Sequence, residues 1–313
     1  MKFIEPSVEI IQQEPGIDGM MKIIEMAGRT AYKSEDYITE DSAKRFVKML
    51  KDKKHGAALE HGTCYLDIPK VVWRDLIDDH NFNFIDCPYQ WFGYSGLTDD
   101  YIHLTTNYRV LVEHGYESLL DWMVVPTEEE FEREIFKRRI TVKFTCDRGV
   151  SHEFVRHRVF SFLQESTRYC NYGKDKFGNQ ITFIIPRWIH DIQEEIASTV
   201  DSATGLSREY FREYQTDILM NNLTTVDRTV SSYMDVLQAI EDCYLDMTME
   251  DGLKPQQARQ ILPNCLKTEL VMTGTIEQWK HFFELRCAPS AHPDAKHLAD
   301  MLKEKFLNEG YIK

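Results

Sequence analysis

The sequence has no run of about 18 consecutive apolar residues, the length that a membrane-spanning helix needs. Near the amino terminus, Glu5 and Pro6 interrupt the apolar core that a secretory signal would require. The seven cysteines are dispersed and include no C-x-x-C pair or zinc-ribbon spacing. We therefore expect a soluble cytoplasmic protein with reduced thiols and without a membrane partner.

Positive charge is also scarce. Lysine and arginine total 37 against 51 aspartate and glutamate residues, which gives a formal net charge of −14. Such a surface would repel the phosphate backbone of nucleic acids and anionic membranes. With 313 residues, 42% of them hydrophobic, the chain is long enough to bury a large core. No Gly/Ser-rich linker or internal repeat divides it, so we expect a single domain over residues 1–313.

Apolar periodicity predicts both helices and strands, and hence a mixed α/β fold. Helical spacing is found over Gly16–Lys33, Asp41–Leu50 and Leu206–Met247. Short segments rich in β-branched or aromatic residues predict strands at Val8–Ile11, Thr63–Ile68, Ile140–Thr145 and Ile181–Ile185. Between Pro69 and Arg138 lies an aromatic-rich region without a clear period, which we interpret as ordered because solvated aromatics would be a liability.

Three helix starts are marked by capping residues or proline. Thr127 precedes an acidic run that suits a helix amino terminus. Thr275 has Gln278 as its capping-box partner, and a buried stripe then extends to a helix end near Arg286. Pro255 suits the first turn of another helix, which carries Arg259 and which Pro263 must end or kink.

Residues 156–168, RHRVFSFLQESTR, form the signature stretch, in which three arginines and a histidine surround two serines. Arginine provides permanent, planar, bidentate donors for phosphate, so the pattern favours anion binding. A solvated helix with ordinary ion pairs, such as Glu153 with Arg156 and Glu165 with Arg168, explains the same composition equally well. On the residues alone, both interpretations remain open.

Two other types of site fit the signature stretch poorly. His152 and His157 are five residues apart, whereas zinc ligands on one helix face stand at i and i+4, and the adjacent arginines would repel a dication. We therefore predict no metal site. His157 is the only nearby base for a serine or cysteine nucleophile, and flanking guanidiniums should depress its pKa. A covalent hydrolase is thus a weak interpretation.

The signature stretch resembles the motif of the flavin-dependent thymidylate synthases, in which Arg-His-Arg is followed by spaced serines and a Ser-x-Arg pair. Further segments resemble the family in the same order: AGRTAYKS at 27–34, LEHGT at 59–63, ARQILP with NCLKTELVMTG at 258–274, and WKHFFELR at 279–286. The family's late helix pair would correspond to residues 258–274. The resemblance implies an antiparallel-rich sheet flanked by helices, with added segments at about 69–138 and 187–246.

The resemblance also implies site residues. Arg286 would be catalytic at the uracil ring, and Arg259 would reach the nucleotide from a neighbouring subunit. The implied FAD contacts are Thr63, Arg156, His157, Arg158, Gln164 and His281. The implied dUMP contacts are Glu153, Arg156, Gln164, Glu165, Ser166, Thr167, Arg168, Arg259 and Arg286.

The implied reaction is reductive methylation of dUMP to dTMP, with methylenetetrahydrofolate and NADPH as co-substrates and FAD as cofactor, in a homotetramer with sites at subunit interfaces. Three positions depart from the family. Glu153 stands where glutamine is usual, and Thr275 and Glu277 stand where many members carry Asn-x-Arg. These departures keep two alternatives open: a non-catalytic nucleotide-binding protein, and a flavoenzyme that acts on another nucleotide.

Overall fold

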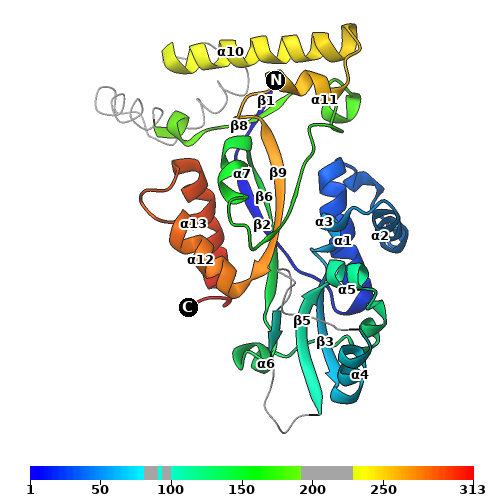
Figure 1. Cartoon of the computed structure of the whole chain (residues 1–313). Coiled ribbons are helices and arrows are strands. Elements are labelled where there is room, and N and C mark those ends of the chain that lie inside the picture. Colours follow the sequence, from blue (N-terminus) through cyan, green and yellow to red (C-terminus); the bar gives the residue numbers. More distant parts are fainter. Residues whose placement is uncertain (81–90, 94–99, 192–227) are drawn as a thin grey trace.

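A four-stranded antiparallel sheet forms the centre of the molecule (Figure 1). The computed structural model describes residues 1–80, 91–93, 100–191 and 228–313. The strand order is β2 (Ser7–Ile11), β6 (Arg139–Asp147), β9 (Lys267–Thr275) and β7 (Ser161–Gln164). β6 and β9 pair along their whole length, from Arg139 opposite Thr275 to Asp147 opposite Lys267. Because side chains alternate between the two faces of a strand, odd-numbered residues of both strands share one face.

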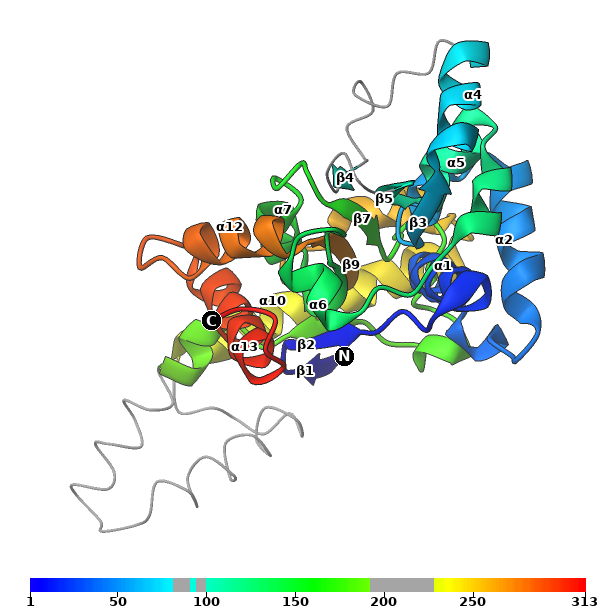
Figure 2. The same cartoon turned by 90° about the horizontal axis from the view of Figure 1, so that it is seen from below.

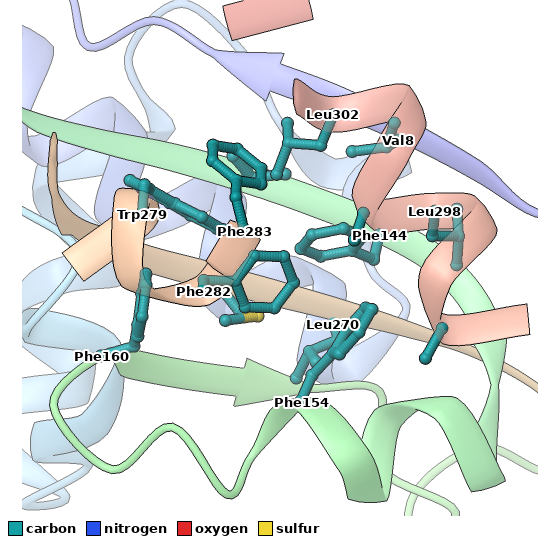
Figure 3. Packing of buried hydrophobic residues seen from close by; sticks show 14 of the residues in the cluster. Val8, Phe144, Phe154, Phe160, Leu270, Trp279, Phe282, Phe283, Leu298 and Leu302 are labelled. Atoms are coloured by element: carbon teal, nitrogen blue, oxygen red, sulfur yellow. The ribbon is translucent and has the colours of Figure 1, made fainter. Parts of the chain in front are cut away.

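The even-numbered face of this sheet packs on α12 (Ile276–Arg286) and α13 (Pro293–Asn308). Apolar side chains from the sheet and both helices form one buried cluster (Figure 3). The ring of Phe282 lies 5.1 Å from that of Phe154 and 5.4 Å from that of Trp279, between centroids. Trp279 also donates its indole N–H to the carbonyl of Ile140 at 3.1 Å, so burial leaves this polar group satisfied.

The odd-numbered face is more polar and is covered by α1 (Gly16–Tyr32) and α3 (Gly56–Leu59), with α2 (Ser42–Asp52) packed on α1. Thr141 and Thr273 lie opposite each other on β6 and β9, and their hydroxyl oxygens are 2.7 Å apart. His61, just after α3, places Nδ1 2.7 Å from the Thr273 hydroxyl. A buried layer of hydrogen-bonded polar side chains therefore separates the sheet from these helices.

A three-stranded antiparallel sheet stands beside α1 and α2. Its order is β3 (Thr63–Pro69), β5 (Tyr101–Asn107) and β4 (Trp91–Gly93). Two helices follow strands of this sheet, α4 (Lys70–His80) after β3 and α5 (Tyr108–His114) after β5, and they lie together at one end of the molecule (Figure 2). A second apolar cluster joins the sheet to α1 and α2, with Ile24, Leu50, Leu66 and Leu104 among its buried members.

At the opposite end, β1 (Lys2–Ile4) pairs in parallel with β8 (Thr182–Ile184), and α10 (Arg228–Leu245) lies across them (Figure 1). These elements share a third apolar cluster, to which Phe3, Phe183 and Tyr244 contribute. In the described residues the other α-helices are short: α6 (Glu128–Glu132), α7 (Arg148–Phe154) and α11 (Pro255–Ala258).

The structure confirms the mixed α/β class with an antiparallel sheet and helices. The helices expected at 16–33 and 41–50 and the four expected strands are present, with small shifts of their ends. Thr275 forms the predicted capping box with Gln278, and Thr127 is the N-cap of α6 as predicted, where it also forms a capping box with Glu130. Of the helical prediction for 206–247, residues 206–227 lie outside the described part. So do Phe82, Phe84, Tyr89 and Tyr94 of the aromatic region.

One prediction is wrong. Residues 258–274 do not form the expected helix pair: Ala258 ends α11, Arg259–Ile261 form one 3-10 turn before Pro263, and strand β9 follows. The side chains of Leu270, Val271 and Met272 are all fully buried, because β9 is central and packs on both faces. Within the described ranges, no helix is long and apolar enough to cross a membrane. The described cysteines are all free.

Candidate functional site

Arg286 ends α12 and is held by residues of the segment that begins with α7. Its Nε donates to His157 Nε2 at 2.9 Å, and its Nη1 donates to Glu153 Oε2 at 2.7 Å. Its Nη2 donates to the main-chain carbonyl of Glu153. Arg156 Nη1 lies farther from the same Glu153 oxygen, at 3.4 Å. The structure thus brings four of the predicted site residues into one cluster at the carboxyl ends of α7 and α12.

Two members of this cluster, Glu153 and His157, have shifted pKa values. The hydrogen bond from Arg286 lowers the pKa of Glu153, so this carboxylate is ionised at neutral pH. The pKa of His157 is lowered to about 4, first by burial and then by the positive charge of Arg286 and by His281. The sequence predicted the direction of this shift but attributed it to the flanking arginines. The main cause is burial against Phe282, whose ring centroid lies 5.0 Å from the imidazole.

The depressed pKa of His157 makes stability depend on pH. In the unfolded chain histidine takes up a proton below about pH 6.5, whereas folded His157 stays neutral until about pH 4. The unfolded state therefore binds more protons between these values, and the free energy of unfolding should fall by roughly 3 kcal/mol as the pH drops through this window. Urea titrations from pH 7 to pH 4.5 should show a shallower decline for His157→Gln; parallel curves for the two proteins would contradict this assignment.

The second group of predicted residues lies on the loop that follows β7. Gln164 donates its side-chain amide to Ser151 Oγ on α7 at 2.8 Å and to Thr268 Oγ1 on β9 at 3.2 Å. The Ser166 amide donates to the carbonyl of Ala31, at the end of α1, at 3.1 Å. Arg259 Nη1 donates to Thr167 Oγ1 at 3.3 Å within the same chain. Partners from four separate segments therefore fix the end of β7 and the loop, and Ser151 ties them to the helix that carries Glu153.

Not all predicted residues have side chains that face outward. Glu165 is only 3% exposed, and its carboxylate accepts hydrogen bonds from Lys267 at 2.8 Å and Tyr172 at 3.3 Å, so its expected ion pair with Arg168 is not formed. Arg158 and Arg168 are exposed. His281 is exposed on α12 and lies 6.4 Å from His157, between ring centroids.

Thr63, the first residue of β3, is linked to the signature stretch by Arg139. The Arg139 guanidinium donates to Thr63 Oγ1 at 3.0 Å and to Ser161 Oγ at 3.2 Å. His61 beside them is fully buried, and burial together with Arg139 lowers its pKa to about 3. In the described part of the chain, His61 Nε2 has no hydrogen-bond partner. Thr63 is thus linked to the signature stretch only indirectly, through Arg139.

Sequence reasoning missed four charged residues that support the site: Arg139, Lys33, Lys267 and Glu269. Lys267 and Glu269 are alternate residues of β9, the segment predicted as helix. Their spacing of two, which places both side chains on one face of a strand, was the available signal. No local pattern marks Arg139 or Lys33, because their partners lie far away in the sequence.

The family model described as thymidylate synthase complementing protein matches residues 127–309. This range holds α6 through α13, and with them every predicted site residue except Thr63. The match covers more than half of the chain, and the chain belongs to this family. Residues 1–126, which include the three-stranded sheet, lie outside the matched range.

Proteins named flavin-dependent thymidylate synthase are similar to this chain. The protein of Corynebacterium diphtheriae is 29% identical over 204 residues, covering 63% of this chain and 64% of the relative. That of Geobacter sulfurreducens is 28% identical over 157 residues, covering 50% and 51%. The chain thus spans half to just under two thirds of these relatives. The solved structure of the UMP/dUMP methylase PolB from Streptomyces cacaoi, bound with 5-Br dUMP, aligns at 15% identity with a TM-score of 0.40, covering 98% of this chain and 93% of PolB.

Proposed function

We propose that this protein is a flavin-dependent thymidylate synthase that converts dUMP to dTMP by reductive methylation, with methylenetetrahydrofolate as carbon donor and NADPH as reductant. Membership of the family supports the class of reaction. The observation that carries the assignment is the convergence of Arg286 on Glu153 and His157, which joins the end of α12 to the signature stretch.

Arg286 is the proposed catalytic residue. A guanidinium remains protonated at neutral pH, so it cannot serve as a general base. It can stabilise negative charge that develops on the uracil N3/O2 edge, and this makes C5 a better nucleophile. Its side chain is only 12% exposed, which strengthens that interaction relative to water. Neutral His157 orients the guanidinium through the Nε hydrogen bond without competing for the substrate's charge.

The loop 164–168 and Arg259 are proposed to hold dUMP. Gln164, Ser166, Thr167 and Arg168 would contact its phosphate and sugar, while Glu153, Arg156 and Arg286 would meet the base. Arg259, which contacts Thr167 in its own chain, would reach the nucleotide of a site shared between subunits. Since the Glu165 carboxylate faces Lys267, Glu165 would contribute through its main chain.

The donor set near the signature stretch suits FAD. Arg156 and Arg158 are exposed arginines two residues apart in the sequence, and guanidinium donors suit a pyrophosphate. Together with Thr63, His157, Gln164 and His281, they are the residues proposed to hold FAD. When bound, FAD would carry the reducing equivalents from NADPH to the transferred carbon.

No enzyme nucleophile is required by this proposal. Among the described cysteines, Cys64 and Cys170 are buried, and burial raises the pKa of each thiol to about 12. Such thiols are protonated at neutral pH and do not attack a pyrimidine. Ser166 would orient dUMP and would not attack it.

We further propose a homotetramer with sites at subunit interfaces, in the cytoplasm. Val155, Val159 and Leu285 are exposed apolar residues around the signature stretch, with exposures of 37%, 59% and 50%. A second copy that covers them would bury this apolar surface. Analytical ultracentrifugation of the purified chain measures the assembly directly.

A non-catalytic nucleotide-binding protein is the second candidate. Thr275 caps α12, and Glu277, an exposed carboxylate 3.9 Å from Lys137, stands where many relatives have an arginine for the flavin. If this contact with the flavin is lost while the loop 164–168 still binds phosphate, the protein would bind dUMP but not FAD.

The visible absorption spectrum separates the two candidates. The purified chain, supplied with FAD and dUMP, is expected to show a flavin band that bleaches under anaerobic NADPH, followed by dTMP formation when methylenetetrahydrofolate is added. A protein that remains colourless after incubation with FAD, yet still binds dUMP, would refute the enzyme assignment in favour of the binding protein.

A further inference from the structure

Four charged side chains lie close together where the loop 164–168 meets the end of α1 and strand β9. Lys267 Nζ lies 2.8 Å from Glu165 Oε2 and 2.7 Å from Glu269 Oε1, and Lys33 Nζ lies 2.9 Å from Glu269 Oε2. We call Lys33, Glu165, Lys267 and Glu269 the buried quartet. Its side chains are between 2% and 18% exposed. Two positive and two negative charges make the quartet itself neutral, and Lys33 Nζ also lies 2.9 Å from Oε1 of the more exposed Glu35.

The quartet is connected to the loop by the main chain as well. The Glu165 amide donates to the carbonyl of Glu269 at 2.8 Å, and the next amide, of Ser166, donates to Ala31, two residues before Lys33. Lys33 has a positive φ of 48° after the last turn of α1. The ion pairs therefore join the end of α1, strand β9 and the loop at one place.

The charges of the quartet support one another. Burial opposes ionisation of Glu269, but Lys267 and Lys33 outweigh it and lower the pKa of Glu269 to about 2. Glu269 in turn raises the pKa of Lys33 against the effect of burial. Removal of one member would leave an uncompensated charge in a poorly solvated place.

We propose that Lys33, Lys267 and Glu269 are positioning residues for the nucleotide phosphate. Together with Glu165, they fix the conformation of the loop 164–168 and set the electrostatic potential at the phosphate site on it. This inference rests on the proposed function, because it assumes that a nucleoside monophosphate binds this loop. None of the four side chains needs to touch the ligand. Their charge balance determines the potential that the phosphate meets.

The test compares two variants that break the same ion pair with opposite changes of charge. Lys267→Met leaves the quartet with a net charge of −1 and should weaken dUMP binding. Glu165→Gln leaves it with +1 and should tighten dUMP binding. At a separation of roughly 10 Å and an effective dielectric constant of about 40, each shift should be about tenfold for a phosphate that carries a charge of roughly −1.5 to −2. The uncharged nucleoside 2′-deoxyuridine should respond to neither change.

The affinities are measured by isothermal titration calorimetry on the full-length chain supplied with FAD, at low ionic strength. The double variant Glu165→Gln/Lys267→Met should return dUMP affinity to near the wild-type value. Lys296→Met, which breaks an exposed ion pair with Asp300 on α13, is the control for a loss of positive charge elsewhere. If Lys267→Met does not fold, Lys33→Met and Glu269→Gln provide the same pair of opposite charges.

Opposite shifts for dUMP with an unchanged deoxyuridine affinity would support the inference. Shifts in the same direction, or equal shifts for the nucleoside, would show that the quartet acts only on folding and would overturn it. A wild-type chain that binds dUMP no better than deoxyuridine would overturn the phosphate site itself, and with it the proposed substrate.

Discussion

Arg286→Ala is expected to abolish dTMP formation, with a loss of roughly a thousandfold or more in kcat. The substitution removes a fixed positive charge at the place where negative charge develops on the pyrimidine, and preorganised donors of this kind commonly contribute factors of 10² to 10³. Binding of dUMP should persist in part, because the loop 164–168 and its supports are untouched. Steady-state turnover and dUMP affinity, measured on the same preparation, separate the two effects.

Glu153→Gln is the matched variant for that experiment. It removes the carboxylate that pairs with Arg286 at 2.7 Å but keeps the guanidinium and the size of the side chain. Turnover should therefore survive, since the charge of Arg286 is then fully available to the substrate. Full activity of Arg286→Ala, or equal losses in both variants, would show that the proposed role of Arg286 is wrong.

Phe282→Ala should reduce the free energy of unfolding by about 3–5 kcal/mol, the usual cost of truncating a phenylalanine in a packed core. Its ring is fully buried and contacts aromatic rings from β6, α7 and α12 itself (Figure 3). The same ring packs on His157, so the cavity would also loosen the hydrogen bond between His157 and Arg286. Urea denaturation followed by circular dichroism measures the change.

Leu307→Ala provides the comparison, on the neighbouring helix α13. Leu307 is about half exposed, and its truncation should change stability by about 0.5 kcal/mol or less. A loss below about 1 kcal/mol for Phe282→Ala would mean that the core tolerates the cavity and does not depend on this ring.

Elements with strong local signals could be predicted from the sequence. The helix Ile276–Arg286 has a capping threonine, a glutamine three residues later and a buried stripe, all within one short segment, and the structure confirms each of them. The strand Val8–Ile11 was likewise visible from its own residues, although its pairing with β6 was not.

β9 shows where local reasoning fails. Its sequence KTELVMTGT contains the consecutive apolar residues Leu270, Val271 and Met272, which suit a buried helix as well as a strand that is covered on both faces. Tertiary contacts decide the matter, because β6 and β7 lie on either side of this segment.

In the candidate site, too, features with a local signal could be predicted and those that depend on tertiary contacts could not. The arginines, histidine and serines of the signature stretch were identified because they are close together in the sequence. The partners that hold them were not, because Lys33, Arg139 and Lys267 come from three other segments and meet only in the folded chain. The buried side chain of Glu165 was missed for the same reason, since its counterion lies on β9.

The central place of β9 also determines when the site can form during synthesis. β6 and the signature stretch leave the ribosome before β9, the strand that joins them, because residues 169–266 lie between the signature stretch and β9. Pairings between such distant segments are slow to form, and until then the edges of β6 and β7 are open to other chains. A nascent chain that stops before residue 267 would contain the whole signature stretch but would lack the strand that pairs with both β6 and β7. Such an incomplete chain exposes unpaired strand edges and is the kind of species that chaperones protect from aggregation.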